Sequence, residues 1–136
     1  RISITGTQSM EDSGPQTLEL VTDGSYCYEP GFALLSYVES EMTGLEGVVT
    51  SFRIEDGQTV TLRRSGKVNA EMVFDRRQAH ESLYDVGFGA MMISVVTEDM
   101  TVLLNEHGGV LDLDYRVEVE HALCSRNRYH IEIQTI

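Results

Sequence analysis

Residues 111–120, which read Leu-Asp-Leu-Asp-Tyr-Arg-Val-Glu-Val-Glu, decide the fold class of this chain. Every odd position in the run is apolar or aromatic, and every even position is charged. Because successive side chains of a β-strand point to opposite faces, this pattern predicts a strand with one face in a core and the other in water. Such a strand is typical of an antiparallel sheet that is solvated on one side.

Short alternations of the same kind, separated by turn residues, extend outward from this run in both directions. Asp56-Gly57 is a strong two-residue hairpin signal, and Glu106-His107-Gly108-Gly109 predicts a second hairpin. Residues 76–82 contain helix-forming side chains, so a short helix is considered there, and residues 42–47 read as a loop. The other predicted strands are residues 2–8, 16–28, 32–41, 48–55, 58–64, 68–74, 80–86, 88–97, 100–105 and 124–136.

About ten consecutive antiparallel strands would leave two unpaired sheet edges, and closing the sheet on itself would remove them. We therefore predict an all-β fold, an up-and-down β-barrel of about ten strands, in a single domain over residues 1–136. A barrel of this size holds either packed side chains or one small ligand. The polar residues that point into it are thus the candidates for function.

Composition excludes several classes of protein. The chain has 136 residues, 41% of them hydrophobic, and a formal net charge of -12. This charge disfavours nucleic acids and anionic lipid surfaces as partners. No apolar run approaches the roughly 20 residues of a membrane helix, and no signal peptide is recognisable. Cys27 and Cys124 form no CxxC motif, so free thiols in a cytoplasmic protein are expected unless their strands meet to form a disulfide.

Arg64 is in phase with Val60 and Leu62 on the apolar face of its predicted strand. An arginine in that position pairs with an acid, reaches water at the strand end, or lines a polar cavity. The sequence leaves these three alternatives open.

Other strands offer further polar residues for the inward face. Both faces of the strand at residues 32–41 are largely apolar, and Tyr37 and Glu39 are interior if the face with Ala33 and Leu35 points inward. Ser125 and Asn127 extend the apolar face of the last strand backwards. An Arg–Glu pair with hydroxyl and amide neighbours would anchor the head of an amphipathic ligand, whereas the same side chains could also plug the barrel, complete a core or satisfy a turn. The candidate ligand-binding residues are Tyr37, Glu39, Arg64, Tyr84, Ser125 and Asn127.

Several segments carry a family resemblance. They are LSYVESEMTGLEG at residues 35–47, RSGKVN at 64–69, MVF at 72–74, Tyr84 with Gly89, and SRN at 125–127. In this order they resemble the segments shared by the uncharacterised YwiB-like bacterial proteins, and the chain departs from that pattern at Val86-Gly87, where the family has Thr-Pro. The resemblance implies a calycin-like barrel, similar in architecture to lipocalins and fatty-acid-binding proteins. It implies no activity.

The sequence names no reaction. The four histidines form no HxH or HxxxH pair, and nucleophile, Walker and Rossmann motifs are absent, so no catalytic residue, metal ligand or cofactor is indicated. We therefore predict a barrel that binds a small amphipathic molecule. The alternative is a structural or interaction module that forms a homo-oligomer, because residues 32–38 and 90–96 are apolar on both faces. Both alternatives are favoured over an enzyme.

Overall fold

The structure, a computed structural model, describes residues 2–10, 13–39, 46–85, 89–119 and 122–135. It describes the backbone alone for residues 2–10, 13–18, 20, 83–85, 90 and 123–124. The described residues form strands and turns without a helix, so the predicted all-β antiparallel class is confirmed. The strands are β1 Ile2–Met10, β2 Ser13–Thr22, β3 Ser25–Glu29, β4 Phe32–Val38, β5 Val49–Glu55, β6 Thr59–Ser65, β7 Asn69–Asp75, β8 His80–Asp85, β9 Ala90–Asn105, β10 Gly108–Val119 and β11 Ala122–Gln134.

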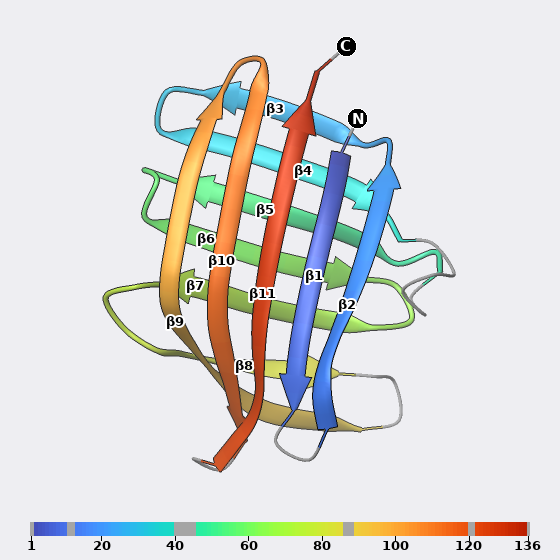
Figure 1. Ribbon diagram of the computed structural model, residues 1–136, viewed down its shortest axis with the longest axis vertical. Coiled ribbons are helices and arrows are strands. Elements are labelled where there is room, and N and C mark those ends of the chain that lie inside the picture. Colours follow the sequence, from blue (N-terminus) through green and yellow to red (C-terminus); the bar gives the residue numbers. More distant parts are fainter. Residues whose placement is uncertain (1, 11–12, 40–45, 86–88, 120–121, 136) are drawn as a thin grey trace.

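All eleven strands belong to one antiparallel sheet with the order β2-β1-β11-β10-β9-β8-β7-β6-β5-β4-β3. Figure 1 shows this sheet folded into two layers, with β3 to β8 running across the back of β1, β2, β9, β10 and β11. The long strand β9 passes from one layer to the other and pairs with both β8 and β10. Side chains between the two layers therefore come from segments far apart in the sequence.

The sequence predicted two strands, 88–97 and 100–105, where the structure has the single strand β9. The ladder with β10 shifts between Asp114 and Tyr115, because Glu98 is an extra residue on the β9 side. This bulge moves the inward positions from odd to even numbers, so that Thr97 and Met100 are both buried. The prediction of two separate strands was therefore wrong.

The chain has a corner where the sequence predicted one strand over residues 16–28. Asp23 and Gly24 separate β2 from β3, and these two strands are the two edges of the sheet. Figure 1 draws β3 across the end of β2 instead of alongside it. The described strands form no β2–β3 ladder, so the predicted closure of the sheet by hydrogen bonds is not observed.

The hairpin predictions are confirmed at two places. Asp56 and Gly57 have φ values of 54° and 65°, the left-handed pair that a type I′ turn requires. Gln58 N donates to Glu55 O across this turn at 3.0 Å. The β9–β10 hairpin turns where Glu106-His107-Gly108-Gly109 predicted it. The predicted loop over residues 42–47 and the family departure at Val86-Gly87 lie mainly or wholly outside the described residues.

The short helix considered for residues 76–82 is wrong. Residues 76–79 form a turn, and β8 begins at His80. The carboxylate of Asp75 holds this turn, since its Oδ1 accepts hydrogen bonds from the backbone N–H and Nε of Arg77, both at 2.9 Å. The Asp75 N–H in turn donates to Thr97 Oγ1 on β9 at 3.1 Å. Side chain to backbone bonds of this kind compete with helix formation.

The contribution of Asp75 to the free energy of unfolding should decrease at acid pH. Its hydrogen bonds from Arg77 lower the pKa of the carboxyl from 3.8 to about 2. A depressed folded-state pKa contributes stability above the unfolded pKa, and that contribution is lost as the pH falls from about 4 through about 2. We expect Asp75→Asn to lose less stability over this window than the wild type in denaturant titrations. Asp23→Asn, in the exposed β2–β3 connection, should follow the wild type; equal acid slopes for all three proteins would contradict this role.

The core lies between the two layers. Phe74 of β7 packs against Tyr115 of β10 with ring centroids 4.6 Å apart, and Phe52 of β5 meets Tyr129 of β11 edge-on at 6.0 Å. Rings held in these geometries add to the stability that burial of apolar area provides. The largest fully buried side chains are Phe52, Phe74, Leu35, Leu62, Leu111, Leu113, Ile131, Val48, Val60, Val95 and Thr50.

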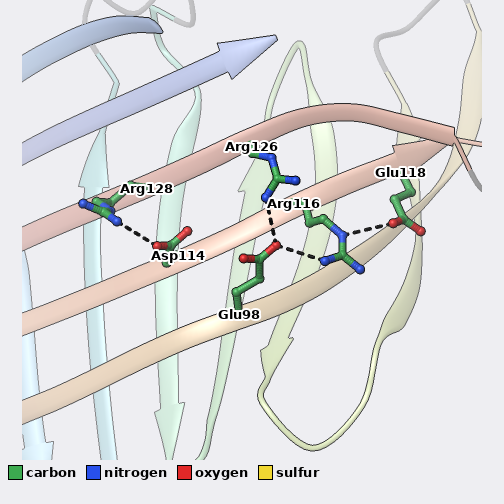
Figure 2. A network of polar contacts seen from close by, with 6 residues as sticks. All are labelled: Glu98, Asp114, Arg116, Glu118, Arg126 and Arg128. Atoms are coloured by element: carbon green, nitrogen blue, oxygen red, sulfur yellow. Dashed lines mark hydrogen bonds and ion pairs between the residues drawn. The ribbon is translucent and has the colours of Figure 1, made fainter. Parts of the chain in front are cut away.

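The outward face of β9, β10 and β11 carries charged side chains that pair with one another (Figure 2). His130, predicted to face outward, lies on this face between Asp112 and Glu132. Exposed pairs of this kind contribute little each, so the network mainly keeps this face solvated. The pairs drawn are Arg116–Glu98 at 3.0 Å, Arg116–Glu118 at 3.1 Å, Arg126–Glu98 at 3.4 Å and Arg128–Asp114 at 2.9 Å.

Within the described ranges, no helix is long and apolar enough to cross a membrane.

Candidate functional site

One row of directly paired residues crosses the back layer near the ends of its strands. The register pairs Tyr37 with Thr50, Thr50 with Arg64, Arg64 with Ala70, and Ala70 with Tyr84. Directly opposed residues of antiparallel strands share a face. Tyr37, Thr50 and Ala70 are buried, so this face of the row is the inner one.

Arg64 reaches across the space between the layers. Its Nη2 donates a hydrogen bond to the hydroxyl oxygen of Tyr129 on β11 at 3.0 Å. The Arg64 side chain is half-buried, so it is neither fully enclosed in the core nor fully exposed at the strand end. The predicted Arg64–Glu39 ion pair stays a prediction.

Glu39 lies just beyond β4, in phase with the buried residues of that strand, and is 4% exposed. Its Oε1 accepts a hydrogen bond from Thr50 Oγ1 at 2.8 Å, and its carboxylate also accepts one from the Tyr37 hydroxyl. Burial raises the pKa of the Tyr37 phenol far above its usual value of 10.0, and the nearby Glu39 charge raises it further. Tyr37 therefore stays protonated and acts as a donor at neutral pH.

We call Tyr37, Glu39, Thr50, Arg64 and Tyr129 the polar cluster. Thr50 of β5 and Arg64 of β6 are directly paired, so the two hydrogen-bonded groups lie side by side on one face. The cluster is graded in exposure, because Tyr37, Glu39 and Thr50 are buried whereas Arg64 and Tyr129 are half-buried.

Ser125 and Asn127, two further predicted site residues, lie on the same inner surface. Ser125 is buried, Asn127 is half-buried, and Asn127 Nδ2 donates to Ser125 Oγ at 2.9 Å. Both precede Tyr129 at two-residue spacing on β11, which places them on its face of the strand. Tyr84 takes its place in the register row opposite Ala70, and its side chain lies outside the described part.

Comparisons with known proteins agree with this architecture. A family model described as a domain of unknown function, DUF1934, matches residues 2–131. The chain belongs to this family. The crystal structure of the YwiB protein from Bacillus subtilis superposes with a TM-score of 0.77 and 24% sequence identity, covering 98% of this chain and 92% of that one. The expected YwiB-like relationship is therefore confirmed; at this identity it shows the fold alone. No curated protein matches the chain.

Two members of the polar cluster were missed as site residues in this DUF1934 chain. Thr50 is in phase with Phe52 and Ile54, and Tyr129 is in phase with Ile131 and Ile133, so each fitted an ordinary core position. Their phase could have identified them, because a polar atom on a buried face needs a hydrogen-bond partner. Which residue of the other layer is that partner depends on the fold and could not be read from the sequence.

Two surface hollows lie away from the polar cluster. One, of about 410 Å³, is lined by Gly57, Gln58, Asp75, Arg76, Arg77 and Met100. The other, of about 310 Å³, lies over the outer face of β9 to β11 beside Arg128. Among the residues that the structure describes, no group of three or more His, Cys, Asp or Glu side chains is placed to hold a metal ion.

Proposed function

We propose that this protein binds a small amphipathic ligand between its two layers, with the head of the ligand at the polar cluster. One observation carries the proposal: a cation, an anion and three hydroxyls gather on an inner face where apolar packing would suffice. Burying charged and polar groups costs solvation free energy that a hydrophobic replacement avoids. A recognition role explains why the chain keeps these groups.

Apolar surface for the tail of the ligand continues from the cluster along β10. Val117 and Val119 pack against the core next to Tyr115 and remain half-exposed. Val117 pairs with Ser125, which connects this surface to the Asn127–Ser125 hydrogen bond. A site with an apolar wall and a few convergent polar groups is the usual form of a small-molecule pocket.

We also propose that the two layers form a calycin-like barrel whose gap lies between β2 and β3. The two-residue connection at Asp23-Gly24 joins the two edges of the sheet at one corner, since consecutive Cα atoms are about 3.8 Å apart. The Tyr26 hydroxyl of β3 donates to Asn105 O at the end of β9 at 2.7 Å, which ties the two layers together. Cys27 on β3 is a free, exposed thiol, which supports a reducing cytoplasm as the proposed location.

Binding of Nile red, an uncharged amphiphilic dye, tests the proposed function. We expect saturable fluorescence enhancement at one site per chain, and Val117→Asn should weaken it about tenfold because the tail surface becomes polar. Leu103→Asn is the matched control, since Leu103 is 65% exposed. A dye that fails to bind, or that loses affinity equally with both variants, would contradict the proposal.

Self-association is the second candidate function. Val38 and Val49 pair directly on the outward face of β4 and β5 and are 57% and 41% exposed. Neighbouring exposed apolar side chains of this kind are a feature of protein interfaces. Sedimentation equilibrium should then show a dimer that Val38→Lys dissociates, whereas a monomer at high concentration would exclude this candidate.

A further inference from the structure

The strand β3 is an edge of the sheet with one open side. Among the described strands it forms a ladder with β4 alone, and Figure 1 shows it as the outermost strand of the back layer. The hydrogen bond from the Tyr26 hydroxyl to Asn105 O holds this strand against the other layer. β3 is therefore fixed in an extended form, with a row of backbone N–H and C=O groups directed to the open side.

The two edges of the sheet differ in how they are protected. Proteins block unwanted pairing at sheet edges with prolines, charged side chains and bulges. The other edge, β2, has all three: Pro15 lies within the strand, Glu19 is exposed, and the ladder with β1 has an extra residue on the β2 side. β3 contains no proline, lysine or bulge, and its one charged residue, Glu29, is at its end. The edge at β3 is thus the one suited to pair with another strand.

The two-residue turn between β3 and β4 determines which backbone groups face the open side. Such a turn is flanked by a hydrogen-bonded pair, and the flanking residues are Glu29 and Phe32. Because hydrogen-bonded and non-hydrogen-bonded pairs alternate along an antiparallel ladder, Cys27 also directs its backbone groups toward β4. The N–H and C=O groups of Tyr26 and Tyr28 are therefore those directed to the open side.

The sequence of β3 is complementary to itself in an antiparallel pair. With Cys27 of two copies directly opposed, Tyr26 of each copy lies opposite Tyr28 of the other, and Ser25 lies opposite Glu29. The Tyr26–Tyr28 pairs then exchange the outward backbone hydrogen bonds. Both tyrosines are on the inner face of β3, so their rings also meet across the two strands.

Neighbouring registers are less favourable. A pair centred on Tyr26 brings Asp23 of one copy opposite Glu29 of the other, and directly opposed like charges are destabilising. A pair centred on Tyr28 places Tyr26 opposite Pro30, which has no N–H to donate. The register centred on Cys27 avoids both conflicts.

We infer that the β3 edge pairs with the β3 edge of a second copy of this chain, in the antiparallel register centred on Cys27. The self-complementary sequence favours a second copy over an unrelated strand as the partner. The contact is short, so the homodimer belongs to the class of weak, transient complexes. This surface differs from the outward face at Val38 and Val49, and it is independent of ligand binding between the layers.

Disulfide cross-linking at Cys27 tests this register. The two Cys27 residues would form a non-hydrogen-bonded pair with Cα atoms about 4.5 Å apart, a separation that a disulfide spans. Cys27 is an exposed free thiol, and Cys124→Ser removes the other cysteine. Copper phenanthroline should then take two electrons from the two thiols, which lose their protons and form a linked dimer on a non-reducing gel. Absence of the linked dimer would overturn the inference.

The matched control moves the thiol along the same face of β3. Ser25→Cys combined with Cys27→Ser leaves an exposed thiol, but in the inferred register the two position-25 thiols lie at least about 13 Å apart along the strands. That distance is too long for a disulfide. Linkage as efficient in this control as at Cys27 would show random collision and would overturn the inference.

Two variants at Tyr28 separate edge pairing from other contacts. Tyr28→Pro removes the N–H directed to the open side, which β4 does not use, and should lower the linked fraction about tenfold. Tyr28→Val keeps that N–H and should retain most of the linkage. Circular dichroism confirms that each variant is folded; a folded Tyr28→Pro variant that links as well as Tyr28→Val would overturn the inference.

Val38→Lys distinguishes the β3 edge from the apolar outward face. Val38 lies beyond the β3–β4 ladder, whose last pair is Ser25 with Ser36. The Val38→Lys variant should therefore link through Cys27 as well as the wild type does. Loss of the linked dimer in this variant would assign the contact to the outward face of β4 and β5 and would overturn the inference.

Discussion

Replacing Gly109 with alanine should destabilise the protein by at least about 3 kcal/mol. Gly109 has a φ of 137°, which side-chain-bearing residues rarely adopt, and an added Cβ would lie 1.9 Å from Leu103 O and 3.0 Å from Leu103 C. The obstructing atoms belong to the backbone of β9, so they move only if the β9–β10 hairpin shifts. That hairpin contributes the inner-face residues Leu111 and Leu113.

Gly89→Ala is the matched control for this prediction. Apart from its chain neighbours, no atom of the described residues lies within 4 Å of a Cβ added there, and its backbone is not left-handed. The control should change the free energy of unfolding by less than about 0.5 kcal/mol. Urea titrations of both variants measure the difference, and equal midpoints for the two would show that the close approach at Gly109 is absent in solution.

Replacing Glu39 with alanine should cost about 3–5 kcal/mol, the usual effect of removing one partner from a buried charged site. Without the carboxylate, the hydroxyls of Tyr37 and Thr50 lose their acceptor inside the protein. Urea unfolding monitored by far-ultraviolet circular dichroism measures this change.

Glu39→Gln separates hydrogen bonding from charge, because the amide oxygen still accepts from Thr50 while the negative charge is gone. We expect it to cost less than Glu39→Ala. Glu55→Gln is the surface control, since the Arg53–Glu55 pair is half-exposed and such pairs contribute about 0–1 kcal/mol. A Glu39→Ala variant no less stable than Glu55→Gln would contradict the buried position of Glu39.

Alternation along single strands predicted much of the candidate site. The period of two placed Ser125 and Asn127 on the apolar face of their strand and Tyr37 with Glu39 on one face of theirs. The structure places the face of Tyr37 and Glu39 inward, which the sequence left open. Arg64 lies on the inner side of β6 as its phase with Val60 and Leu62 predicted. These residues were accessible to sequence reasoning because each side-chain direction is set within its own strand.

Contacts between the layers could not be predicted in the same way. The Arg64–Tyr129 hydrogen bond joins residues 65 positions apart in the chain, and it depends on how the two layers cross. The bulge at Glu98 changes the phase of β9, and the corner at Asp23-Gly24 ends one strand and starts another. Neither segment differs in sequence from an ordinary exposed position. A turn follows β7 where a short helix was considered. The carboxylate of Asp75 accepts a hydrogen bond from the turn residue Arg77, and the Asp75 N–H donates to Thr97 of the distant strand β9. The second partner could not be known from the local sequence.

A crystal structure of the protein grown in the presence of Nile red tests ligand binding most directly. We expect electron density for the dye between the two layers, with its polar end at the polar cluster and its apolar part against Val117 and Val119. Density for protein side chains alone across this inner surface, with the dye absent or bound only at the exterior, would contradict the proposed function.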